Sequence, residues 1–121
     1  MPTRLAVKRA YAPAAKEDGF RILVDRLWPR GLHKDEARVD LWVKDVAPSD
    51  SLRRWFGHGP AKWQEFSRRY DGELDANPEA IIRLKSALAG HTRATLLYAA
   101  RDEEHNNAVA LAAWLHRQQI I

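Results

Sequence analysis

Short apolar segments bounded by polar residues predict the strands of this chain. Residues 4–9 alternate loosely between apolar and basic positions, residues 20–26 pass through Ile22-Leu23-Val24 into an acid–base pair, and residues 94–100 form a similar run. Runs of about four to eight apolar residues with such flanks are typical of strands. Residues 41–44 add a short strand or an extended segment.

Apolar residues at three- and four-residue spacing predict helices between and after these strands. A short helix follows the stop and N-cap candidate at residues 47–50, and Gly57 ends it. The clearest helix runs from about Pro60 to Asp75, and the next runs from Asn77-Pro78 to Gly90. A last helix, which Asp102 is expected to cap, follows the strand at 94–100. The residues expected to face inward are, for these four helices in chain order, Leu52, Trp55 and Phe56; Trp63, Phe66, Tyr70 and Leu74; Ile81, Leu84 and Leu88; and Ala108, Leu111, Ala112 and Leu115.

Helices that alternate with strands predict an α/β fold: a small, mostly parallel sheet flanked by helices in three layers, as in Rossmann-like proteins. The chain has 121 residues, of which 45% are hydrophobic. This length suits one domain with a real core and is too short for two. We therefore expect residues 1–121 to form a single α/β domain.

Composition and missing motifs exclude several classes of protein. The chain has no cysteine, so disulfides, thiolate nucleophiles and cysteine-bound metal centres are excluded. Sequence signatures of dinucleotide binding, P-loops, serine esterases and zinc peptidases are also missing. No apolar run approaches the roughly 20 residues of a membrane span, and no signal peptide follows Met1. A soluble, cytoplasmic protein is expected, with no membrane partner.

Two of the predicted strands end in an adjacent acid and base. Asp25-Arg26 follows the strand at 20–26, and Arg101-Asp102 follows the strand at 94–100. If these strands are parallel neighbours, their carboxyl ends bring the four side chains to one edge of the sheet, where open α/β folds bind ligands. Asp25 and Arg26 point to opposite faces because strand side chains alternate. One of the two is therefore expected to be structural.

An anionic ligand, of phosphate or nucleotide type, is the leading hypothesis for this site, because arginine matches such groups with paired donors. His105 is a candidate acid–base residue at the mouth of the last helix, and His58 lies between two glycines on a loop that can close over a site. The candidate ligand-binding residues are Arg26, Arg30, Lys44, Arg53, Arg101, Asp102, Asn106 and Trp28, and the catalytic candidates, if the protein is an enzyme, are His105, His58 and Asp25.

Each of these candidates also has a plainer interpretation. Asp25 can accept N–H groups of the turn at 28–30, Asp102 can serve only as an N-cap, and His105 can satisfy local backbone groups. About half of the arginines are expected to pair with nearby carboxylates. His58 and His105 have no diagnostic metal spacing, so no metal site is predicted. The sequence names neither a cofactor nor an oligomeric state.

The charge distribution leaves a second function open. The net charge is +4, and residues 1–60 carry twelve Lys/Arg against eight Asp/Glu, whereas residues 61–121 carry eight of each. Four of the five tryptophans lie in the first 63 residues. A basic, tryptophan-rich half suits a nucleic-acid-binding or regulatory module. A third alternative is an interaction protein without a ligand, with buried aromatic residues and dispersed arginines.

Several motifs resemble one known family over nearly the whole chain. They are residues 24–31 (Val-Asp-Arg-Leu-Trp-Pro-Arg-Gly), 52–58 (Leu-Arg-x-Trp-Phe-x-His), 63–74 and 97–106. In these motifs the chain resembles the family called domain of unknown function 488, in its small YeaO-like branch. The resemblance implies a small prokaryotic α/β protein without an agreed activity. Larger relatives often carry Cys-His-Arg where this chain has Glu104-His105-Asn106, so only His105 carries over and a thiol-based role does not.

Overall fold

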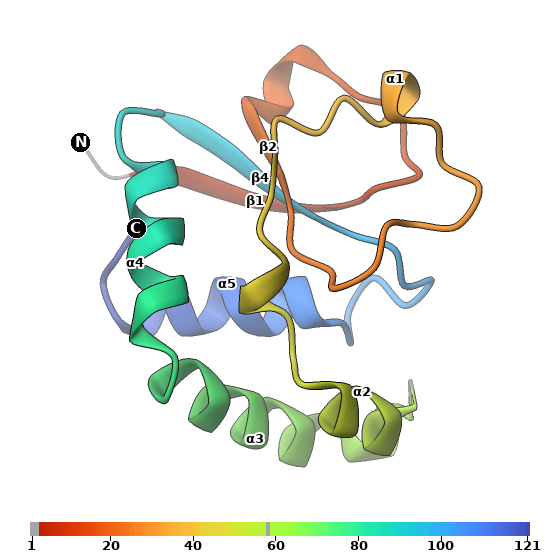
Figure 1. Cartoon of the computed structure of the whole chain (residues 1–121), viewed down its shortest axis with the longest axis vertical. Helices are drawn as coiled ribbons and strands as arrows, with labels where there is room; N and C mark the ends of the chain where they lie inside the picture. Colours follow the sequence, from red (N-terminus) through yellow and green to blue (C-terminus); the bar gives the residue numbers. More distant parts are fainter. Residues whose placement is uncertain (1–2, 58) are drawn as a thin grey trace.

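The computed structural model describes residues 3–57 and 59–121 and contains a small sheet with helices (Figure 1). The strands are β1 (Arg4–Arg9), β2 (Phe20–Leu23), β3 (Leu41–Trp42) and β4 (Arg93–Tyr98). The helices are α1 (Lys34–Ala37), α2 (Asp50–Phe56), α3 (Trp63–Asp75), α4 (Pro78–Leu88) and α5 (Asn107–Arg117). None of the described helices combines the length and apolar composition that crossing a bilayer requires.

The sheet has the strand order β1-β4-β2-β3, and all of its neighbouring strands are parallel. In the register, Arg9 pairs with Tyr98 and Leu23 pairs with Leu97. The predicted α/β fold is therefore confirmed. Strands β2 and β4 are parallel neighbours, which was the condition for a shared site at their carboxyl ends. Because all four strands end at one edge, which we call the carboxyl edge, the segments after β2 and β4 leave the sheet side by side.

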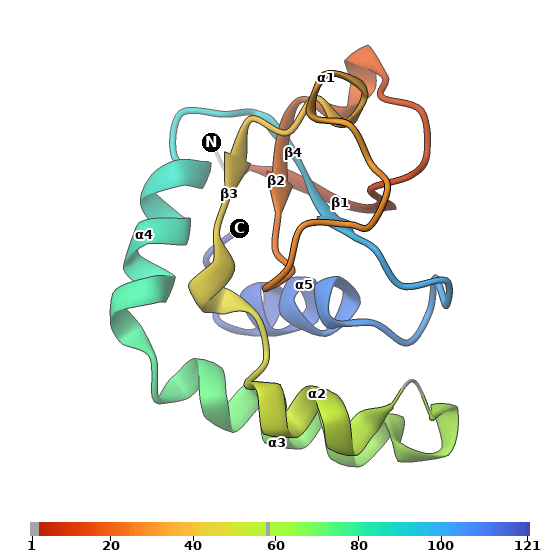
Figure 2. The ribbon, with the colours of Figure 1, turned by 45° about the vertical axis from the view of Figure 1, so that its right-hand side comes forward.

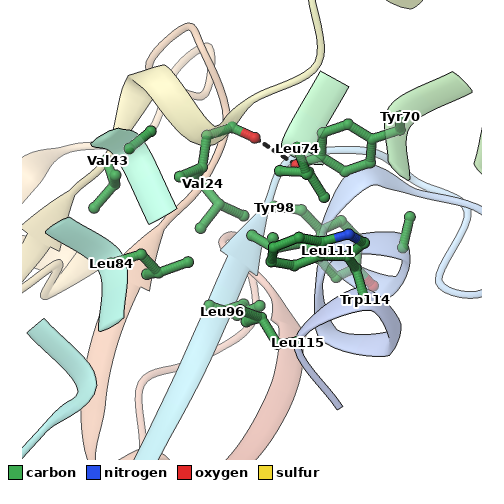
Figure 3. Close-up of a cluster of buried hydrophobic side chains, with 14 of the residues drawn as sticks. Val24, Val43, Tyr70, Leu74, Leu84, Leu96, Tyr98, Leu111, Trp114 and Leu115 are labelled. Atoms are coloured by element: carbon green, nitrogen blue, oxygen red, sulfur yellow. Dashed lines mark hydrogen bonds between the residues drawn. The ribbon is translucent and has the colours of Figure 1, made fainter. Parts of the chain in front are cut away.

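One face of the sheet carries the main core. Alternation sends Ile22, Leu96 and Tyr98 to this face, where α5 packs against β1 and β4. Helix α3 packs on α5, and α2 packs on α3, so the helices build outward from the sheet (Figure 2). Figure 3 shows Leu111 and Trp114 of α5 close to Tyr70 and Leu74 of α3 in this core.

The buried polar groups of this core have partners. The buried hydroxyl of Tyr70 donates a hydrogen bond to the carbonyl of Val46, and the indole N–H of Trp114 donates to Asp75 at 3.1 Å. A buried hydroxyl or indole N–H without a partner would cost about 1–3 kcal/mol. The two bonds therefore also fix how α3 lies against the turn at Lys44–Val46 and against α5.

The opposite face is covered mainly by the connection between β2 and β3, which includes α1. Leu23 and Leu97 point to this side and meet a group of partly buried residues. That group consists of Trp28, Leu32, Val39 and Trp42. Arg21, only 4% exposed, donates to the carbonyl of Ala37 and to the carboxylate of Asp18. A buried arginine thus holds the start of β2, the Lys16–Asp18 turn and α1 together.

The predicted stops and caps around α2 are confirmed. The hydroxyl of Ser49 accepts the N–H of Leu52 at 3.2 Å, and Gly57 ends the helix in the left-handed conformation with φ of 51°. The clearest predicted helix is also present, with its first three residues, Pro60–Lys62, in a 3-10 turn before α3. Helix α1 was not predicted, because its single turn has no apolar periodicity.

Candidate functional site

Asp25 lies at the carboxyl edge and joins three elements there. Its Oδ2 accepts the backbone N–H of Ala99 at 2.9 Å, and its Oδ1 accepts the side-chain amide of Asn107 at 2.9 Å. Asn107 also donates to the carbonyl of Val24 at 3.2 Å. The carboxylate therefore connects the ends of β2 and β4 to the first residue of α5. Asp25 does accept a backbone N–H, as its plainer interpretation expected, but from Ala99 rather than from the turn at 28–30.

Arg26 leaves the carboxyl edge in another direction, toward α2. Its Nη2 lies 3.4 Å from the carbonyl of Ala47 and 3.3 Å from that of Pro48. The pKa of Asp50 is lowered, chiefly by its hydrogen bond from Arg53 and to a smaller degree by the charge of Arg26. Adjacent in sequence, Asp25 and Arg26 thus have separate surroundings, in agreement with strand alternation.

Asp102 and His105 form a hydrogen-bonded pair in the segment that follows β4. One oxygen of Asp102 accepts the N–H groups of Glu104 and His105, each at 2.9 Å, and the other lies 2.9 Å from Nδ1 of His105. The N–H of Glu104 and the ring of His105 hold the pKa of Asp102 below its usual range. The carboxylate orients the imidazole as in acid–base pairs, and the ring meets Trp63 edge-on at 5.3 Å.

The expected N-cap role of Asp102 is wrong. Helix α5 begins at Asn107, and its N-cap is Asn106, whose side-chain oxygen accepts the N–H of Val109 at 3.0 Å. Asn106 is 2% exposed and donates to the carbonyl of Asp102 at 3.0 Å. The physical reason is the turn at residues 102–105. Because of this turn, α5 begins four residues later than predicted, and Asp102 accepts the N–H groups of the turn instead of those of the helix.

Arg30 and Arg101 have exposed side chains, and neither has a carboxylate partner among the described residues. The hydroxyl of Tyr11 donates to the carbonyl of Arg30 at 2.7 Å. Arg9, whose guanidinium lies 5.2 Å from the Tyr11 ring, donates to the carbonyl of Ala100 at 2.9 Å. These contacts link the loop of Arg30 to the end of β4, where Arg101 follows.

The remaining candidates have other surroundings. Lys44 lies over the ring of Trp42 at 4.1 Å, and Arg53 pairs with Asp50 at 2.6 Å on α2. The indole of Trp28 donates to the carbonyl of Leu32 at 2.7 Å and contacts Trp42 edge-on. His58 lies outside the described residues. Arg53 is therefore removed from the group at the carboxyl edge, and the ring of Trp28 is already engaged.

Two cavities lie apart from Arg30, Arg101 and His105, and one of them is lined in part by the candidate Arg26. One, of about 330 Å³, is lined by Arg26, Tyr70 and Glu73 among others, and Glu73 accepts the N–H of Ser49 at 2.7 Å. The other, of about 420 Å³, lies at the amino ends of the strands beside His91 and is lined in part by Arg93. Neither of these two cavities is lined by Arg30, Arg101 or His105. Within residues 3–57 and 59–121, no three His, Asp or Glu side chains are grouped as metal ligands.

A family comparison matches almost the whole chain. The profile described as "Inactive DUF488-N3 subclade" matches residues 4–120. The chain belongs to the DUF488 family. It is 42% identical to an uncharacterised protein of Mycobacterium tuberculosis over 114 residues, which are 94% of this chain and 95% of that protein. It is also 42% identical to the uncharacterised protein YeaO of Escherichia coli over 108 residues, covering 89% and 93% of the two chains. No solved structure gives a significant match.

In this DUF488 chain, sequence reasoning missed three residues of the carboxyl edge: Arg9, Tyr11 and Asn107. Arg9 ends β1, and a pairing of β1 with β4 would have placed it beside the end of β4, but the order of the strands was open. Asn107 follows Asn106 in the sequence, and nothing in the pattern separates the cap from the residue that binds Asp25. Tyr11 lies in a polar loop without periodicity, so it had no signal of its own.

Proposed function

We propose that this protein binds a small phosphate-type anion at the carboxyl edge without transforming it. The observation that carries the proposal is the pair of exposed guanidinium groups, Arg30 and Arg101, that lack carboxylate partners among the described residues and leave the sheet at one edge. Guanidinium groups present paired N–H donors that match phosphate oxygens. Arg9 adds a third positive charge beside them.

Binding without catalysis is favoured because the carboxylates of this edge are already engaged. Both oxygens of Asp25 accept hydrogen bonds that join strands to α5, and both oxygens of Asp102 bind residues of its own turn. Each of these carboxylates thus already has a role in holding the fold, which favours binding over proton transfer by Asp25 or Asp102. The description of the matching subclade as inactive agrees with this proposal.

The charges around the pair set the expected strength of binding. Asp102, Glu103 and Glu104 follow Arg101 directly, so the net charge of this surface is small. Affinity must then come from directed guanidinium hydrogen bonds rather than from long-range attraction. One anion that contacts two arginines releases few counterions, and we expect a shallow dependence of binding on salt.

Calorimetric titration with inorganic phosphate, pyrophosphate and adenosine monophosphate tests the proposal. We expect saturable binding of at least one of them, with affinity lowered tenfold or more in Arg30→Gln and in Arg101→Gln. Arg4→Gln is the matched control, because Arg4 is exposed at the amino end of β1. Absence of saturable binding, or an equal loss in the control, would refute the proposal. Turnover of pyrophosphate or adenosine monophosphate would refute its non-catalytic part.

A further inference from the structure

A second cationic surface, which we call the basic face, lies on α2, on the turn before α3 and on the first half of α3. It consists of Arg53, Arg54, Lys62, Arg68 and Arg69. These two helices contact each other at the end of the molecule that lies farthest from α1 (Figure 1). The basic face shares no residue with the proposed anion site, which uses Arg30 and Arg101.

Two carboxylates organise the arginines of this face into pairs. Asp50 binds Arg53 at 2.6 Å and Arg54 at 2.7 Å. Glu65 binds Arg68 at 2.6 Å and Arg69 at 2.7 Å. Each guanidinium has five N–H donors and uses only one or two of them in these pairs. The remaining donors of four exposed arginines are available to acceptors in solution.

Trp55 joins the two arginine pairs into one surface. The Arg69 guanidinium lies 4.2 Å from the centre of the Trp55 ring, and the Lys62 ammonium lies 5.2 Å from it. Lys62 also donates to the carbonyl of Trp55 at 2.8 Å. Because Trp55 follows Arg54 on α2, cations of the turn and of α3 are held beside those of α2. Cation–π contacts of this kind keep flexible side chains in place.

The charge of this face is strongly positive. The described residues between 50 and 69 carry five cationic and two acidic side chains, a net charge of +3 out of +4 for the whole chain. Hydrogen bonds from Arg68 and Arg69 lower the pKa of Glu65 to about 2, so this acid stays paired and ionised well below neutral pH. Charge complementarity therefore calls for a polyanion.

The chemistry of the face favours nucleic acid over an acidic protein. Four of the five cations are arginines, which bind phosphate oxygens with paired donors. Stable protein interfaces have an apolar core, whereas protein–nucleic acid interfaces are polar and positively charged. Of the residues that the structure describes, the large hydrophobic ones with exposed side chains are Tyr11, Leu27 and Ile82, and all three lie outside residues 50–69. The basic face thus lacks what a protein partner would need.

We infer that the basic face binds the phosphate backbone of nucleic acid, through the arginine pairs of α2 and α3 and without reading the bases. The ring of Trp55 is half-buried and already in contact with Lys62 and Arg69, so it offers no open platform for base stacking. Binding is then driven by charge, and its affinity falls linearly with salt on logarithmic axes.

Fluorescence anisotropy with a labelled 20-base-pair DNA duplex and a labelled 20-nucleotide oligothymidylate, at several salt concentrations from about 50 to 200 mM, tests this inference. We expect binding to both probes at the lowest salt. The double variant Arg54→Gln/Arg68→Gln is expected to weaken duplex binding tenfold or more at low salt and to reduce the salt slope by about 2, at roughly 0.9 per lost phosphate contact.

The charge-matched control is Lys34→Gln/Lys85→Gln, which removes two exposed cations on α1 and α4. It is expected to keep the wild-type slope, and Arg30→Gln/Arg101→Gln is expected to keep it as well. Absence of binding at 50 mM salt, or an equal loss in the lysine control, would overturn the inference. Equally effective competition by polyglutamate would overturn it too, because the face would then bind acidic protein.

The two proposals, binding of a small anion at the carboxyl edge and binding of nucleic acid at the basic face, can be refuted independently. The Arg54→Gln/Arg68→Gln variant is expected to bind pyrophosphate as the wild type does, since neither residue lies at the carboxyl edge. Circular dichroism and a urea unfolding curve confirm that this variant is folded. Both side chains are 75% exposed, so their replacement removes no packing from the core.

Discussion

The carboxylate of Asp25 accepts the backbone N–H of Ala99 at 2.9 Å, across 74 residues of sequence. This bond connects the loop after β2 with the segment after β4, and Asn107 extends the connection to α5. The residue that looked like a candidate catalytic base is thus a structural link at the edge where a ligand is proposed to bind. Its contribution to stability can be measured apart from any function.

Asp25→Asn is expected to lower the free energy of unfolding by about 1–3 kcal/mol, because the new amide places a donor against the Ala99 N–H or against Asn107. Urea unfolding followed by tryptophan fluorescence measures the change. Asp35→Asn, on the exposed side of α1, is the matched control and is expected to stay within about 0.5 kcal/mol of the wild type. Equal stability of the two variants would contradict the structural role of Asp25.

Amide hydrogen exchange can distinguish the role of Asn106, the N-cap of α5, from that of Asp102, which caps the preceding turn. Asn106→Ala is expected to speed exchange at the Val109 amide and to cost about 1 kcal/mol, because the helix loses its N-cap acceptor. Asp102→Ala is expected to speed exchange at Glu104 and His105 and to leave Val109 protected. Faster exchange at Val109 in both variants to the same degree would contradict the assignment of Asn106 as the cap.

Asp18 is expected to contribute to acid unfolding. Burial alone would raise its pKa, but the N–H of Ala15 and the charges of Lys8 and Arg21 outweigh burial and lower it. A lowered pKa in the folded state means that the stabilisation is complete above the unfolded value of about 3.9 and is lost as pH falls below it.

Asp18→Asn is therefore expected to cost about 2 kcal/mol at pH 7, as a lost charged hydrogen bond does. It is also expected to flatten the dependence of stability on pH in the acid range. Urea unfolding in steps from pH 7 to about pH 2 measures both effects. An unchanged acid profile would show that other carboxylates dominate acid unfolding.

Two glycines with positive φ allow the cost of a steric clash to be distinguished from the cost of backbone strain. Gly31 has φ of 77° with no atom within 4 Å of an added Cβ, so Gly31→Ala is expected to cost only the strain of about 1–2 kcal/mol. Gly19 has φ of 65°, and its Cβ would lie 2.3 Å from the carbonyl oxygen of Arg93. Gly19→Ala is expected to cost roughly 2–5 kcal/mol, since overpacking is added to strain. Equal losses of thermal stability would contradict the clash at Gly19.

The strands and most helices followed from local pattern because their signals are short-range. Apolar runs placed the starts of β2 and β4 to within one residue, although the two strands end three and two residues earlier than predicted. The stop at Gly57 needs only a backbone that accepts positive φ. The start of α5 did not follow, because Asp102 and Asn106 are both good N-caps. The turn in which Asp102 binds His105 decided between them.

The sequence predicted the position of the candidate site better than it predicted which residues form the site. The carboxyl edge does bring together the segments after β2 and β4. However, Arg26 extends toward α2, Arg53 lies on α2, and Asp25 accepts amide N–H groups from Ala99 and Asn107. Arg9 and Tyr11 also lie at this edge, although the sequence pattern did not indicate either residue as part of the site. Which side chains share a surface depends on strand order and on long-range hydrogen bonds, which local periodicity does not contain.

The sequence by itself determined the α/β class, the approximate positions of most strands and helices, and the excess of basic side chains. These follow from periodicity and composition, which act over a few residues. Only the tertiary structure decided which arginines lie together at the carboxyl edge and which lie on α2 and α3 around Trp55. The physical reason is that the neighbours of a guanidinium are set by the packing of strands, loops and helices, which the local sequence pattern does not contain.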